Sequence, residues 1–279
     1  MTRAVRVCVF GLGEAGSLLA ADLAAAGVEV AGYDPAGVAT PPGVVRHGDP
    51  RLAATGVDLV LAVTAAADAA GALAQALDAI SRGAVYADAA TASAGLKREL
   101  AARATGAHLG FADVALMAPV AGTGLRTPAL VSGPSARELV AFLAPLGMPV
   151  ENAGPEPGLA ATRKLLRSVV VKGLTAVVME SMRAAEAAGL AAETWDNLVA
   201  QLGALDEATV RRLVEGTGRH AARRVHEMEA ACELLVELGV EPTMTAATAA
   251  HLRRVAADSG SGREIGRQGT GSRGQKAGG

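Results

Sequence analysis

Residues 5–35 read VRVCVFGLGEAGSLLAADLAAAGVEVAGYDP, and this stretch decides the fold. A Val-rich run ends at Gly11, Gly13 and Gly16, an Ala/Leu-rich run follows, and a second apolar run closes at Asp34. The pattern predicts a strand, a tight glycine turn, a helix and a second strand. In that context the G-x-G-x-x-G spacing is typical of a dinucleotide-binding turn, whereas the spacing alone would be a weak signal.

Each glycine has its own physical task in such a turn. The first makes the tight turn, the second lets the backbone approach the pyrophosphate, and the third lets the helix pack closely on the sheet. The helix presents its N-terminal amides to the phosphates, and a carboxylate in its first turn is favoured by the helix dipole without any role in binding. We expect the cofactor to be lined here by Gly11, Leu12, Gly13, Glu14, Ala15 and Gly16.

Asp34 decides which cofactor the site prefers. A carboxylate at the end of the second strand accepts hydrogen bonds from the adenosine ribose of NAD and repels the 2′-phosphate of NADP. The surrounding segment YDPAG offers no arginine to hold that phosphate. We therefore expect NAD to be favoured over NADP; the alternative is that Asp34-Pro35 is simply a turn.

The remainder of the N-terminal half alternates strands with helices. This alternation implies right-handed βαβ crossovers and a parallel sheet, so the fold class is α/β with a doubly wound, Rossmann-type sheet. Val63 and Thr64, at the end of the strand predicted over 58–63, are also assigned to the cofactor site. Strands are predicted over 5–10, 28–33, 43–46, 58–63 and 83–87 and within HLGFADVALM, PALVSG and GMPVEN, with helices over 14–26, 68–80, 93–103 and 135–143.

The chain changes character at NAGPEPG, residues 152–158, whose prolines and glycines suggest a linker. No strand is predicted beyond it, so an all-helical C-terminal domain follows. Its helices are expected over 159–188, 192–202, 206–215, 221–238 and 243–257. The predicted domains are a dinucleotide-binding domain over 1–155, a helical substrate and dimerisation domain over 156–258, and a disordered Gly/Ser/Arg tail over 259–279, which has too few apolar residues to offset the entropy of ordering.

Composition and charge exclude several classes of protein. Hydrophobic residues make up 51% of the chain and aromatic residues only 2%, so the core is built from Ala, Val and Leu. A net charge of −2 gives no electrostatic argument for a nucleic-acid partner. No apolar run approaches the roughly 18–20 residues of a membrane helix. Cys8 and Cys232 are far apart and lack metal-ligand spacing, so we expect no metal site, no disulfide framework and a cytoplasmic location.

The chain resembles the β-hydroxyacid dehydrogenase superfamily, which includes 3-hydroxyisobutyrate dehydrogenase and 6-phosphogluconate dehydrogenase. It is most similar to a poorly characterised, phosphogluconate-dehydrogenase-like branch with its own type of helical C-terminal domain. The likeness covers residues 5–257 and rests on FGLGEAG, YADAATAS, the segment 113–133 and the segment 158–189. The resemblance of YADAATAS to the family's strand-end segment implies that Thr91 lies near the nicotinamide ribose; alternatively, Thr91 and Ser93 cap the next helix.

The segment MAPVAG, residues 117–122, resembles the family's substrate-binding Asp-Ala-Pro-Val-Ser-Gly stretch. The family serine, which helps to hold the substrate carboxylate, is Ala121 here. Backbone amides at Gly122 and Thr123 would still allow an anion nest. The missing hydroxyl puts an ordinary small hydroxyacid substrate in doubt.

The long helix predicted from residue 159 resembles the family helix that carries a catalytic lysine, with an asparagine one turn later. Lys164 matches the lysine, and Ser168 stands where the asparagine would be. At about 100° per residue, an apolar stripe for packing falls on Leu166, Val169, Val170, Gly173 and Val177, with Lys164, Ser168, Lys172 and Thr175 on the other side. Spacing alone favours a solvated face for Lys164, whereas the resemblance favours catalysis.

Two further residues are candidates for contact with the substrate. Lys172, two turns after Lys164, is placed either to repel its charge or to bind an anionic substrate. His226-Glu227 falls where many relatives have Lys-Asp, so His226 is a candidate lining residue, although a lone helical histidine is more often on the surface. Arg223, Arg224 and Glu227 are expected to form ion pairs on the helix surface.

The sequence therefore predicts an NAD(P)-dependent oxidoreductase that moves a hydride between nicotinamide and a small polar substrate in the cleft between the domains. Lys164 is the expected acid/base, and Ser168 the expected partner of the substrate oxygen. Two alternatives stay open: reduction of C=N bonds, as in related imine reductases, and an NAD(H)-binding sensor without turnover. A homodimer is expected by analogy with such helical domains.

Overall fold

The computed structural model of this chain describes residues 5–77 and 79–260 and divides into two compact units, Met1–Val169 and Val170–Gly279. The division falls inside a long helix, so the first turns of that helix belong with the sheet, whereas the sequence suggests a boundary in the loop before it. The tail expected to be disordered lies outside the described residues from residue 261 onward, while residues 259 and 260 still belong to the last helix.

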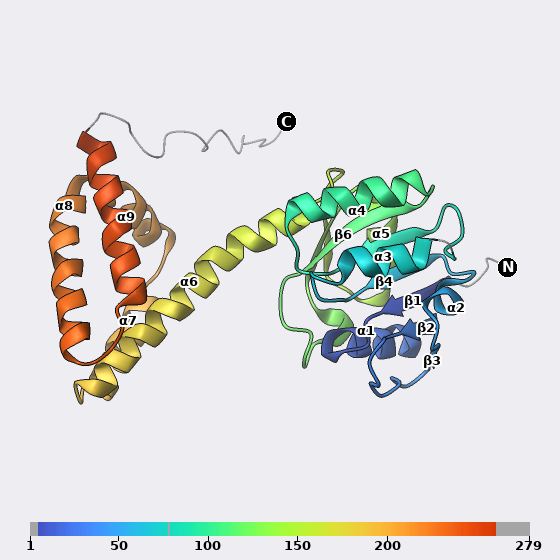
Figure 1. The fold of residues 1–279 in the computed structure, drawn as a ribbon, viewed down its shortest axis with the longest axis horizontal. Coiled ribbons are helices and arrows are strands. Elements are labelled where there is room, and N and C mark those ends of the chain that lie inside the picture. Colours follow the sequence, from blue (N-terminus) through green and yellow to red (C-terminus); the bar gives the residue numbers. More distant parts are fainter. Residues whose placement is uncertain (1–4, 78, 261–279) are drawn as a thin grey trace, which may run out of the picture. The chain divides into compact units, whose positions relative to one another are not determined.

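The first unit is built around an eight-stranded sheet of order β3-β2-β1-β4-β5-β6-β7-β8 (Figure 1). Neighbouring strands are parallel except β6 and β7, which pair antiparallel. The predicted α/β class with a doubly wound sheet is confirmed, and the antiparallel β7 is a departure from a fully parallel sheet. The strands are β1 (Arg6–Phe10), β2 (Glu29–Tyr33), β3 (Val44–Arg46), β4 (Leu59–Ala62), β5 (Val85–Asp88), β6 (Gly110–Leu116), β7 (Ala129–Ser132) and β8 (Val150–Gly154).

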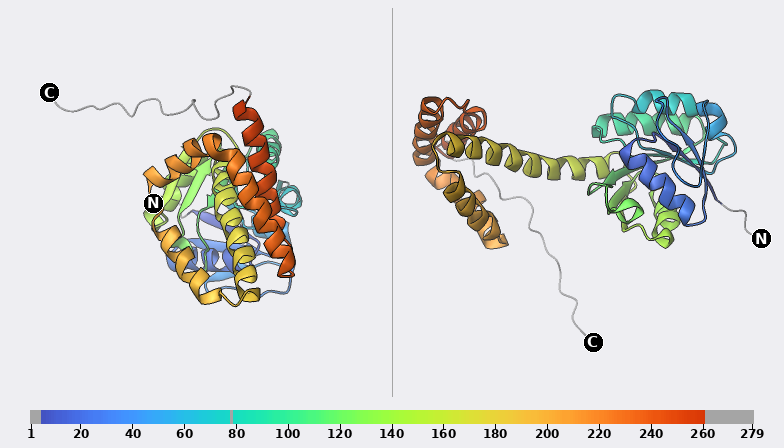
Figure 2. Two further views of the ribbon diagram at one scale, coloured as in Figure 1. Left: turned by 90° about the vertical axis from the view of Figure 1, so that its left-hand side faces the viewer. Right: turned by 90° about the horizontal axis from the view of Figure 1, so that it is seen from below.

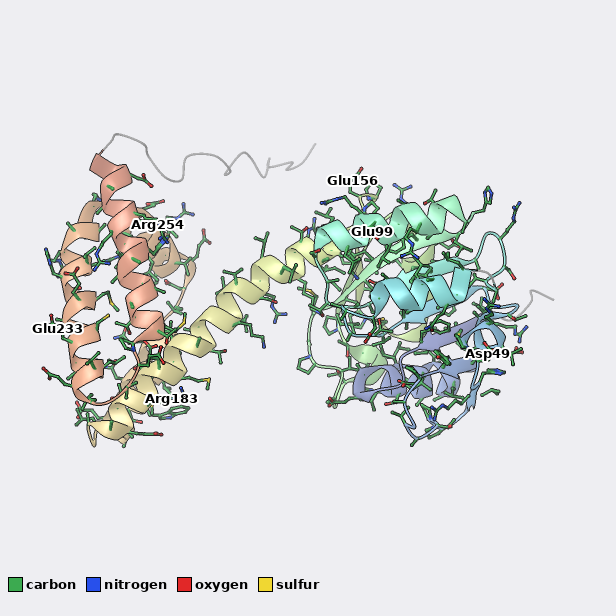
Figure 3. All side chains as sticks on the ribbon, viewed as in Figure 1. Asp49, Glu99, Glu156, Arg183, Glu233 and Arg254 are labelled. Atoms are coloured by element: carbon green, nitrogen blue, oxygen red, sulfur yellow. The ribbon has the colours of Figure 1, made fainter. Side chains whose placement is uncertain are left out.

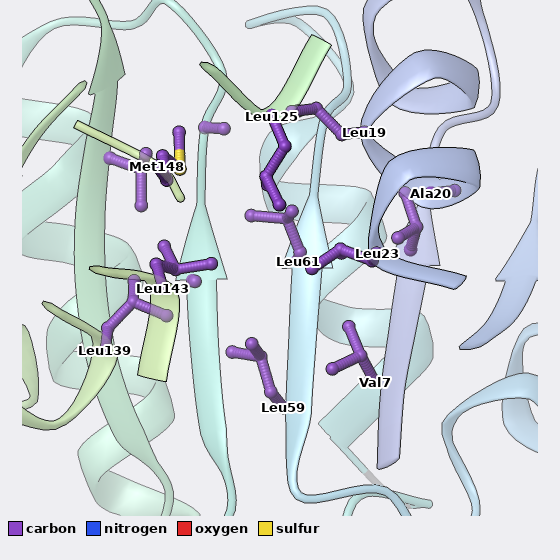
Figure 4. Packing of buried hydrophobic residues seen from close by; sticks show 14 of the residues in the cluster. Val7, Leu19, Ala20, Leu23, Leu59, Leu61, Leu125, Leu139, Leu143 and Met148 are labelled. Atoms are coloured by element: carbon purple, nitrogen blue, oxygen red, sulfur yellow. The ribbon is translucent and has the colours of Figure 1, made fainter. Parts of the chain in front are cut away.

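Helices cover both faces of this sheet. Side chains alternate along each strand, so in β1 Val7 and Val9 face one core while Cys8 and Phe10 face the other. The first core includes residues of α1 and α5 (Figure 4), and the second includes residues of α2, α3 and α4. The helices are α1 (Glu14–Ala25), α2 (Pro50–Ala54), α3 (Ala69–Leu77), α4 (Ala94–Gly106) and α5 (Ala136–Leu143), with the 3₁₀ turns η1 (Gly124–Arg126) and η2 (Ala144–Leu146).

The short helix α2 was not predicted, although its start carries a readable signal. Asp49, which Figure 3 labels, precedes Pro50, and its carboxylate accepts a hydrogen bond from the Arg51 amide at 2.8 Å. A side-chain cap followed by proline in the first turn is a regular helix start. The helix has only five residues, which is too short for a periodic apolar pattern to reveal it.

The second unit is helical. It contains the later part of α6 (Leu159–Ala187), then α7 (Ala191–Gly203), α8 (Glu207–Glu237) and α9 (Thr243–Gly260), and α8 runs beside α9 (Figure 2). Two separate helices were expected over 206–215 and 221–238, and this expectation is wrong because α8 is continuous. Gly216 and Gly218 lie between the two expected helices, but a helical glycine costs only about 1 kcal/mol, much less than a proline.

The Glu180 carboxylate of α6 supplies the cap of α9. Its oxygens accept hydrogen bonds from the amides of Met244 at 2.7 Å and Thr245 at 2.8 Å, and from the Thr245 hydroxyl at 2.6 Å. The first amides of a helix have no partner within the helix, so a buried carboxylate at this end is stabilising. Among the described residues, no helix combines the length and the apolar character needed to cross a membrane.

Candidate active site

The predicted glycine turn joins β1 to α1 and is shaped by backbone contacts. Gly11 has φ +87°, and a Cβ there would lie 2.4 Å from the carbonyl oxygen of Val63. A Cβ on Gly16 would lie 1.8 Å from the carbonyl oxygen of Gly11, whereas a Cβ on Gly13 would meet no atom within 4 Å. The turn is therefore closed at its first and third glycines and open at its second, the position at which a pyrophosphate needs to approach the backbone.

A cavity of ≈ 440 Å³ opens beside this turn. It includes Asp34, Val63 and Thr64, which the sequence assigned to the cofactor site, because β1, β2 and β4 are parallel neighbours that end at the same edge of the sheet. The hydroxyl of Thr64 is buried and has no hydrogen-bond partner among the described residues. An open glycine and an unpaired hydroxyl in one cavity fit a polar ligand such as a dinucleotide. The sequence did not identify the wall that α3 contributes, with Gly71, Ala72 and Gln75.

Asp34 is held in place by the glycine turn itself. One carboxylate oxygen accepts a hydrogen bond from the Leu12 amide at 2.7 Å, and the other accepts one from the Ala36 amide at 2.8 Å. The carboxylate thus fixes both the turn and the loop that follows β2. Asp34-Pro35 therefore forms a turn, as the alternative interpretation expected. The Asp34 carboxylate nevertheless lines the cavity.

An arginine from outside the expected cofactor site contacts this loop. Arg46 of β3 donates to the carbonyl oxygens of Asp34 at 3.1 Å and Ala36 at 2.5 Å, and also to that of Val38. It is absent from the segment YDPAG but reaches it because β3 pairs with β2, with Arg46 opposite Gly32. Only strand pairing brings this residue to the loop, so local sequence gave no sign of it.

Lys164 and Thr91 come together in the first unit. The Lys164 Nζ atom donates a hydrogen bond to the Thr91 hydroxyl at 2.9 Å, although the two residues are 73 positions apart. Thr91 lies in the loop between β5 and α4, and Lys164 lies in the second turn of α6. Because β5 is the parallel neighbour of β4, this loop leaves the same edge of the sheet as the cofactor cavity. Ser93, the other capping candidate, caps α4 by accepting a hydrogen bond from the Leu96 amide at 3.2 Å.

The surroundings of Lys164 favour its neutral amine. Burial lowers the pKa of Lys164, and the positive charges of Lys97 and Arg167 lower it further, while the negative charge of Asp113 opposes them. A lysine with a lowered pKa exchanges protons more readily near neutral pH, as an acid/base group must. Among these charged neighbours, Lys97 and Asp113 are buried and were not identified from the sequence.

The loop that resembles the family's substrate-binding stretch is fixed by its own hydrogen bonds. The Thr123 amide donates to the carbonyl oxygen of Val120 at 3.0 Å, and the Thr123 hydroxyl contacts that of Thr127 at 2.7 Å. The expected anion nest therefore has no free Thr123 amide. Gly122 is exposed with φ +78°, and Ala121 is exposed beside it.

The exposure of α6 differs from the expected packing pattern. The apolar stripe was expected to pack, but the exposed fractions of Leu166, Val169 and Val170 are 65%, 71% and 69%. Lys164 and Ser168, on the other side, are half-buried. The prediction of a packed stripe is wrong for these three residues, whose side chains are exposed in this structure. Arg167 donates to the carbonyl oxygen of Met117 and so links this helix to the loop over residues 117–122.

Lys172 and His226 belong to the second unit, where each is on the surface. The Nδ1 atom of His226 lies 3.3 Å from a Glu229 carboxylate oxygen, and its side chain is 83% exposed. Arg223 forms the expected surface ion pair with Glu227, at 2.7 Å. Within the second unit these residues therefore form part of a charged helix surface.

Two sequence families match the chain. Residues 6–132 match the family described as the NAD binding domain of 6-phosphogluconate dehydrogenase. Residues 185–255 match a helical domain of unknown function, DUF1932. No curated protein matches the chain by sequence.

Solved structures with similar folds cover nearly the whole chain. A conserved hypothetical protein from Sinorhizobium meliloti 1021 is 27% identical with a TM-score of 0.60, and the match covers 97% of this chain and 92% of that one. A conserved protein of unknown function, described as structurally similar to 3-hydroxyacid dehydrogenases, is 28% identical with a TM-score of 0.57, over 91% of this chain and 99% of that one. An imine reductase from Streptomyces aurantiacus has a TM-score of 0.75 at 21% identity, over 91% and 95% of the two chains, and this likeness concerns the fold alone.

Proposed function

We propose that this chain, whose residues 6–132 match the family of the NAD binding domain of 6-phosphogluconate dehydrogenase, is an NAD(P)-dependent oxidoreductase with Lys164 as its acid/base. The observation that carries the proposal is the 2.9 Å hydrogen bond between Lys164 and Thr91 at the edge of the sheet where the cofactor cavity opens. The substrate is a small polar alcohol or carbonyl compound of the hydroxyacid type.

The nicotinamide, when bound, supplies a hydride acceptor or donor. In alcohol oxidation the neutral Lys164 amine would accept the proton of the substrate hydroxyl, while the carbon that bears this hydroxyl loses a hydride to the nicotinamide. In carbonyl reduction the Lys164 ammonium donates a proton to the oxygen. Thr91 orients the Lys164 amine through their hydrogen bond, and Ser168, one turn later, is placed to contact the substrate oxygen. The Gly122 amide, and Lys172 and His226 of the second unit, stay candidates for substrate binding.

Asp34 supports NAD as the preferred cofactor. Its carboxylate lines the cavity, and its negative charge would repel the 2′-phosphate on the adenosine ribose of NADP. The guanidinium of Arg46 is already held by the three carbonyl oxygens of the 34–38 loop, so it has limited capacity for a 2′-phosphate.

Imine reduction is the second candidate function, and the loop over residues 117–123 supports it. A carboxylate substrate needs donors, yet Ala121 has no hydroxyl and the Thr123 amide is occupied within the loop. A C=N substrate without a carboxylate makes no such demand. The imine reductase from Streptomyces aurantiacus shares the fold, which is compatible with this chemistry without assigning it.

The proposed role of Lys164 is tested with Lys164→Ala. We expect turnover to fall on the order of 10²- to 10⁴-fold, the usual contribution of a general acid or base, with cofactor affinity little changed. The assay follows absorbance at 340 nm with 2- and 3-hydroxyacids and NAD⁺ or NADP⁺, and with cyclic imines and the reduced cofactors. The class of compound that is turned over separates the two candidate functions.

Arg163→Ala is the matched control, because Arg163 is the exposed cation immediately before Lys164 and pairs only with Glu151, at 3.4 Å, among the described residues. It should retain full turnover. Undiminished turnover of Lys164→Ala across the panel would show that the catalytic assignment is wrong. Tight NADH binding without transfer of deuterium from labelled cofactor to any compound would instead indicate a sensor.

We also propose that the protein is a homodimer. The second unit exposes large apolar side chains on successive helices, among them Val170 on α6, Trp195 and Val199 on α7, and Val214 on α8. Large exposed apolar side chains on neighbouring helices are a feature of protein–protein contact surfaces. We expect this surface of the helical domain to pack against a second copy of the chain.

A further inference from the structure

Three fully buried charged side chains lie where β5, β6 and α4 meet. The Nζ atom of Lys97 donates to the backbone oxygen of Asp88 at 2.8 Å and to its carboxylate at 2.6 Å, and it lies 3.1 Å from the carboxylate of Asp113. All three side chains are 0% exposed. Asp88 and Asp113 are direct neighbours in the pairing of β5 with β6, so a single ammonium serves two adjacent carboxylates.

Such a cluster is expensive to bury and is poor evidence for stability by itself. Removing charges from water costs several kcal/mol per ion, and apolar side chains of similar volume are often at least as stable. Two carboxylates with one ammonium also leave one net negative charge. Burial and the nearby Asp113 raise the pKa of Asp88, although Lys97 opposes them. The contacts of the cluster with neighbouring elements therefore indicate a role beyond filling the core.

The cluster holds the first turn of α6. The second carboxylate oxygen of Asp113 accepts hydrogen bonds from the Ala161 amide at 3.0 Å and from the Ser132 hydroxyl at 3.1 Å. The Ser132 oxygen in turn accepts one from the Ala160 amide at 2.9 Å. These are two of the first amides of α6, which have no partner within the helix, and the helix dipole adds to the attraction of a carboxylate.

The same cluster holds the loop that carries Thr91. This loop runs from Asp88, the last residue of β5, to α4, and Lys97 joins the two ends through its bonds to Asp88. Lys164 lies about one turn after the amides that Asp113 and Ser132 bind. Both partners of the hydrogen bond between Lys164 and Thr91 are thus anchored to one buried cluster.

We propose that Lys97 is the positioning residue for Lys164: its buried ammonium binds Asp88 and Asp113 together, which fixes the Thr91 loop and the first turn of α6, and it sets the charge around the Lys164 amine. This inference deepens the proposed function and rests on it for the role of Lys164. The charged groups that act on the Lys164 amine are Lys97 on α4, Asp113 on β6 and Arg167 on α6. Of the two positive ones, Lys97 has the larger effect and is shielded from solvent.

The test measures the reactivity of the Lys164 amine directly, so it needs no substrate. The chain has only four lysines, Lys97, Lys164, Lys172 and Lys276. Competitive labelling with acetic anhydride between pH 6 and 11, followed by peptide mass spectrometry, reports each amine separately. Lys172, on the same helix, is the internal comparison.

The variant is Lys97→Met combined with Asp88→Asn, which removes one positive and one negative charge and keeps the net charge of the cluster. We expect the Lys164 labelling rate at pH 7.5 to fall on the order of threefold to tenfold, because Lys97 is one of the positive charges that lower the pKa of Lys164, whereas Asp88 is not among the charged groups that act on it. Lys97→Arg alone keeps both charges and should label at the wild-type rate. Arg163→Ala removes an exposed charge from the same helix turn and should leave the rate unchanged.

Circular dichroism and a thermal melt establish that the double variant is folded. If it is not, Lys97→Gln with Asp88→Asn makes the same charge change and retains hydrogen-bond donors. A folded variant whose Lys164 labels at the wild-type rate overturns the proposal. A loss of turnover in Lys164→Ala, or its absence, leaves this result unaffected, so failure of the proposed function and failure of the positioning role are separately visible.

Discussion

Gly13 and Gly16 lie in the same turn but meet different surroundings. A Cβ on Gly16 would lie 1.8 Å from a backbone oxygen that cannot move without opening the turn, whereas a Cβ on Gly13 would meet no atom within 4 Å. The requirement for glycine is therefore structural at the third position of the motif. At the second position it concerns the space left for a ligand.

Replacing these two glycines should separate folding from binding. Gly16→Ala should destabilise the first unit by about 1–3 kcal/mol or more, since the added methyl overlaps the backbone. Gly13→Ala should melt within a few degrees of wild type but bind NADH on the order of tenfold more weakly, because the methyl occupies the approach of the pyrophosphate. Thermal melts and fluorescence titration with NADH measure the two effects. Full NADH affinity in Gly13→Ala would contradict this placement of the cofactor.

The sequence marks candidate site residues where a local motif or a family resemblance exists. The glycines and Asp34 are marked by their spacing and their place after predicted strands, and Lys164 and Thr91 by a family resemblance. Lys97 was not found, because a lysine in a predicted helix is normally read as solvated. Its burial depends on Asp88 and Asp113, which come from two strands that only the sheet brings together.

At the scale of elements, α9 begins on a carboxylate that belongs to another helix. Burial by itself raises the pKa of Glu180, but hydrogen bonds from the Thr245 hydroxyl and from the amides of Met244, Thr245 and Thr243 outweigh it and hold the pKa below its ordinary value. A group whose pKa is lowered by folding stabilises the folded state above its unfolded pKa. That contribution is lost as the pH falls through the folded pKa.

The cap should therefore make the helical unit sensitive to acid. Glu180→Gln should lower the free energy of unfolding by about 0.5–2 kcal/mol at neutral pH, the range for lost helix caps. The difference between variant and wild type should be constant above about pH 4.3, the ordinary glutamate pKa, and should shrink below it. Urea unfolding at several pH values and hydrogen exchange at Met244 and Thr245 measure this. A difference that persists unchanged at the lowest pH would rule out the charged cap.

Element boundaries were predictable to within a few residues for most of the chain, and the failures have physical causes. The break expected inside α8 is absent, because two glycines do not interrupt this helix. The antiparallel β7 was not foreseen, since PALVSG has no local sign of strand direction. The packed stripe expected on α6 follows correctly from helical periodicity, but periodicity identifies an apolar face without showing whether this chain covers it.

At the scale of the whole molecule, the two units differ in how well they bury apolar side chains. The first has a core on each face of its sheet, built from large side chains such as Phe10, Leu73 and Leu139. In the second unit the buried hydrophobic side chains are few and mostly alanine among the described residues, while Trp195, Val199 and Val214 are exposed. An independent helical unit with so much exposed apolar surface is expected to be marginally stable alone.

The proposed homodimer is tested by light scattering and sedimentation. We expect wild type to have twice the mass of one chain, and Val169→Glu with Val170→Glu to shift the population towards monomer and lower its melting temperature by several degrees. Leu52→Glu is the control, because Leu52 is a similarly exposed apolar residue on α2, away from the helical unit's own helices. A monomeric wild type at micromolar concentration would refute the dimer.

The hydrogen bonds of Asp34 and Arg46 bear on how readily the cofactor preference could evolve or be engineered. The Asp34 carboxylate also ties the glycine turn to the loop after β2, and Arg46 gathers the carbonyl oxygens of that loop. Exchanging Asp34 for a neutral residue would remove the repulsion of a 2′-phosphate and, at the same time, release the Leu12 amide. If Asp34 selects NAD as proposed, selectivity and loop order depend on the same side chain, and a change to NADP requires at least one compensating change in the loop.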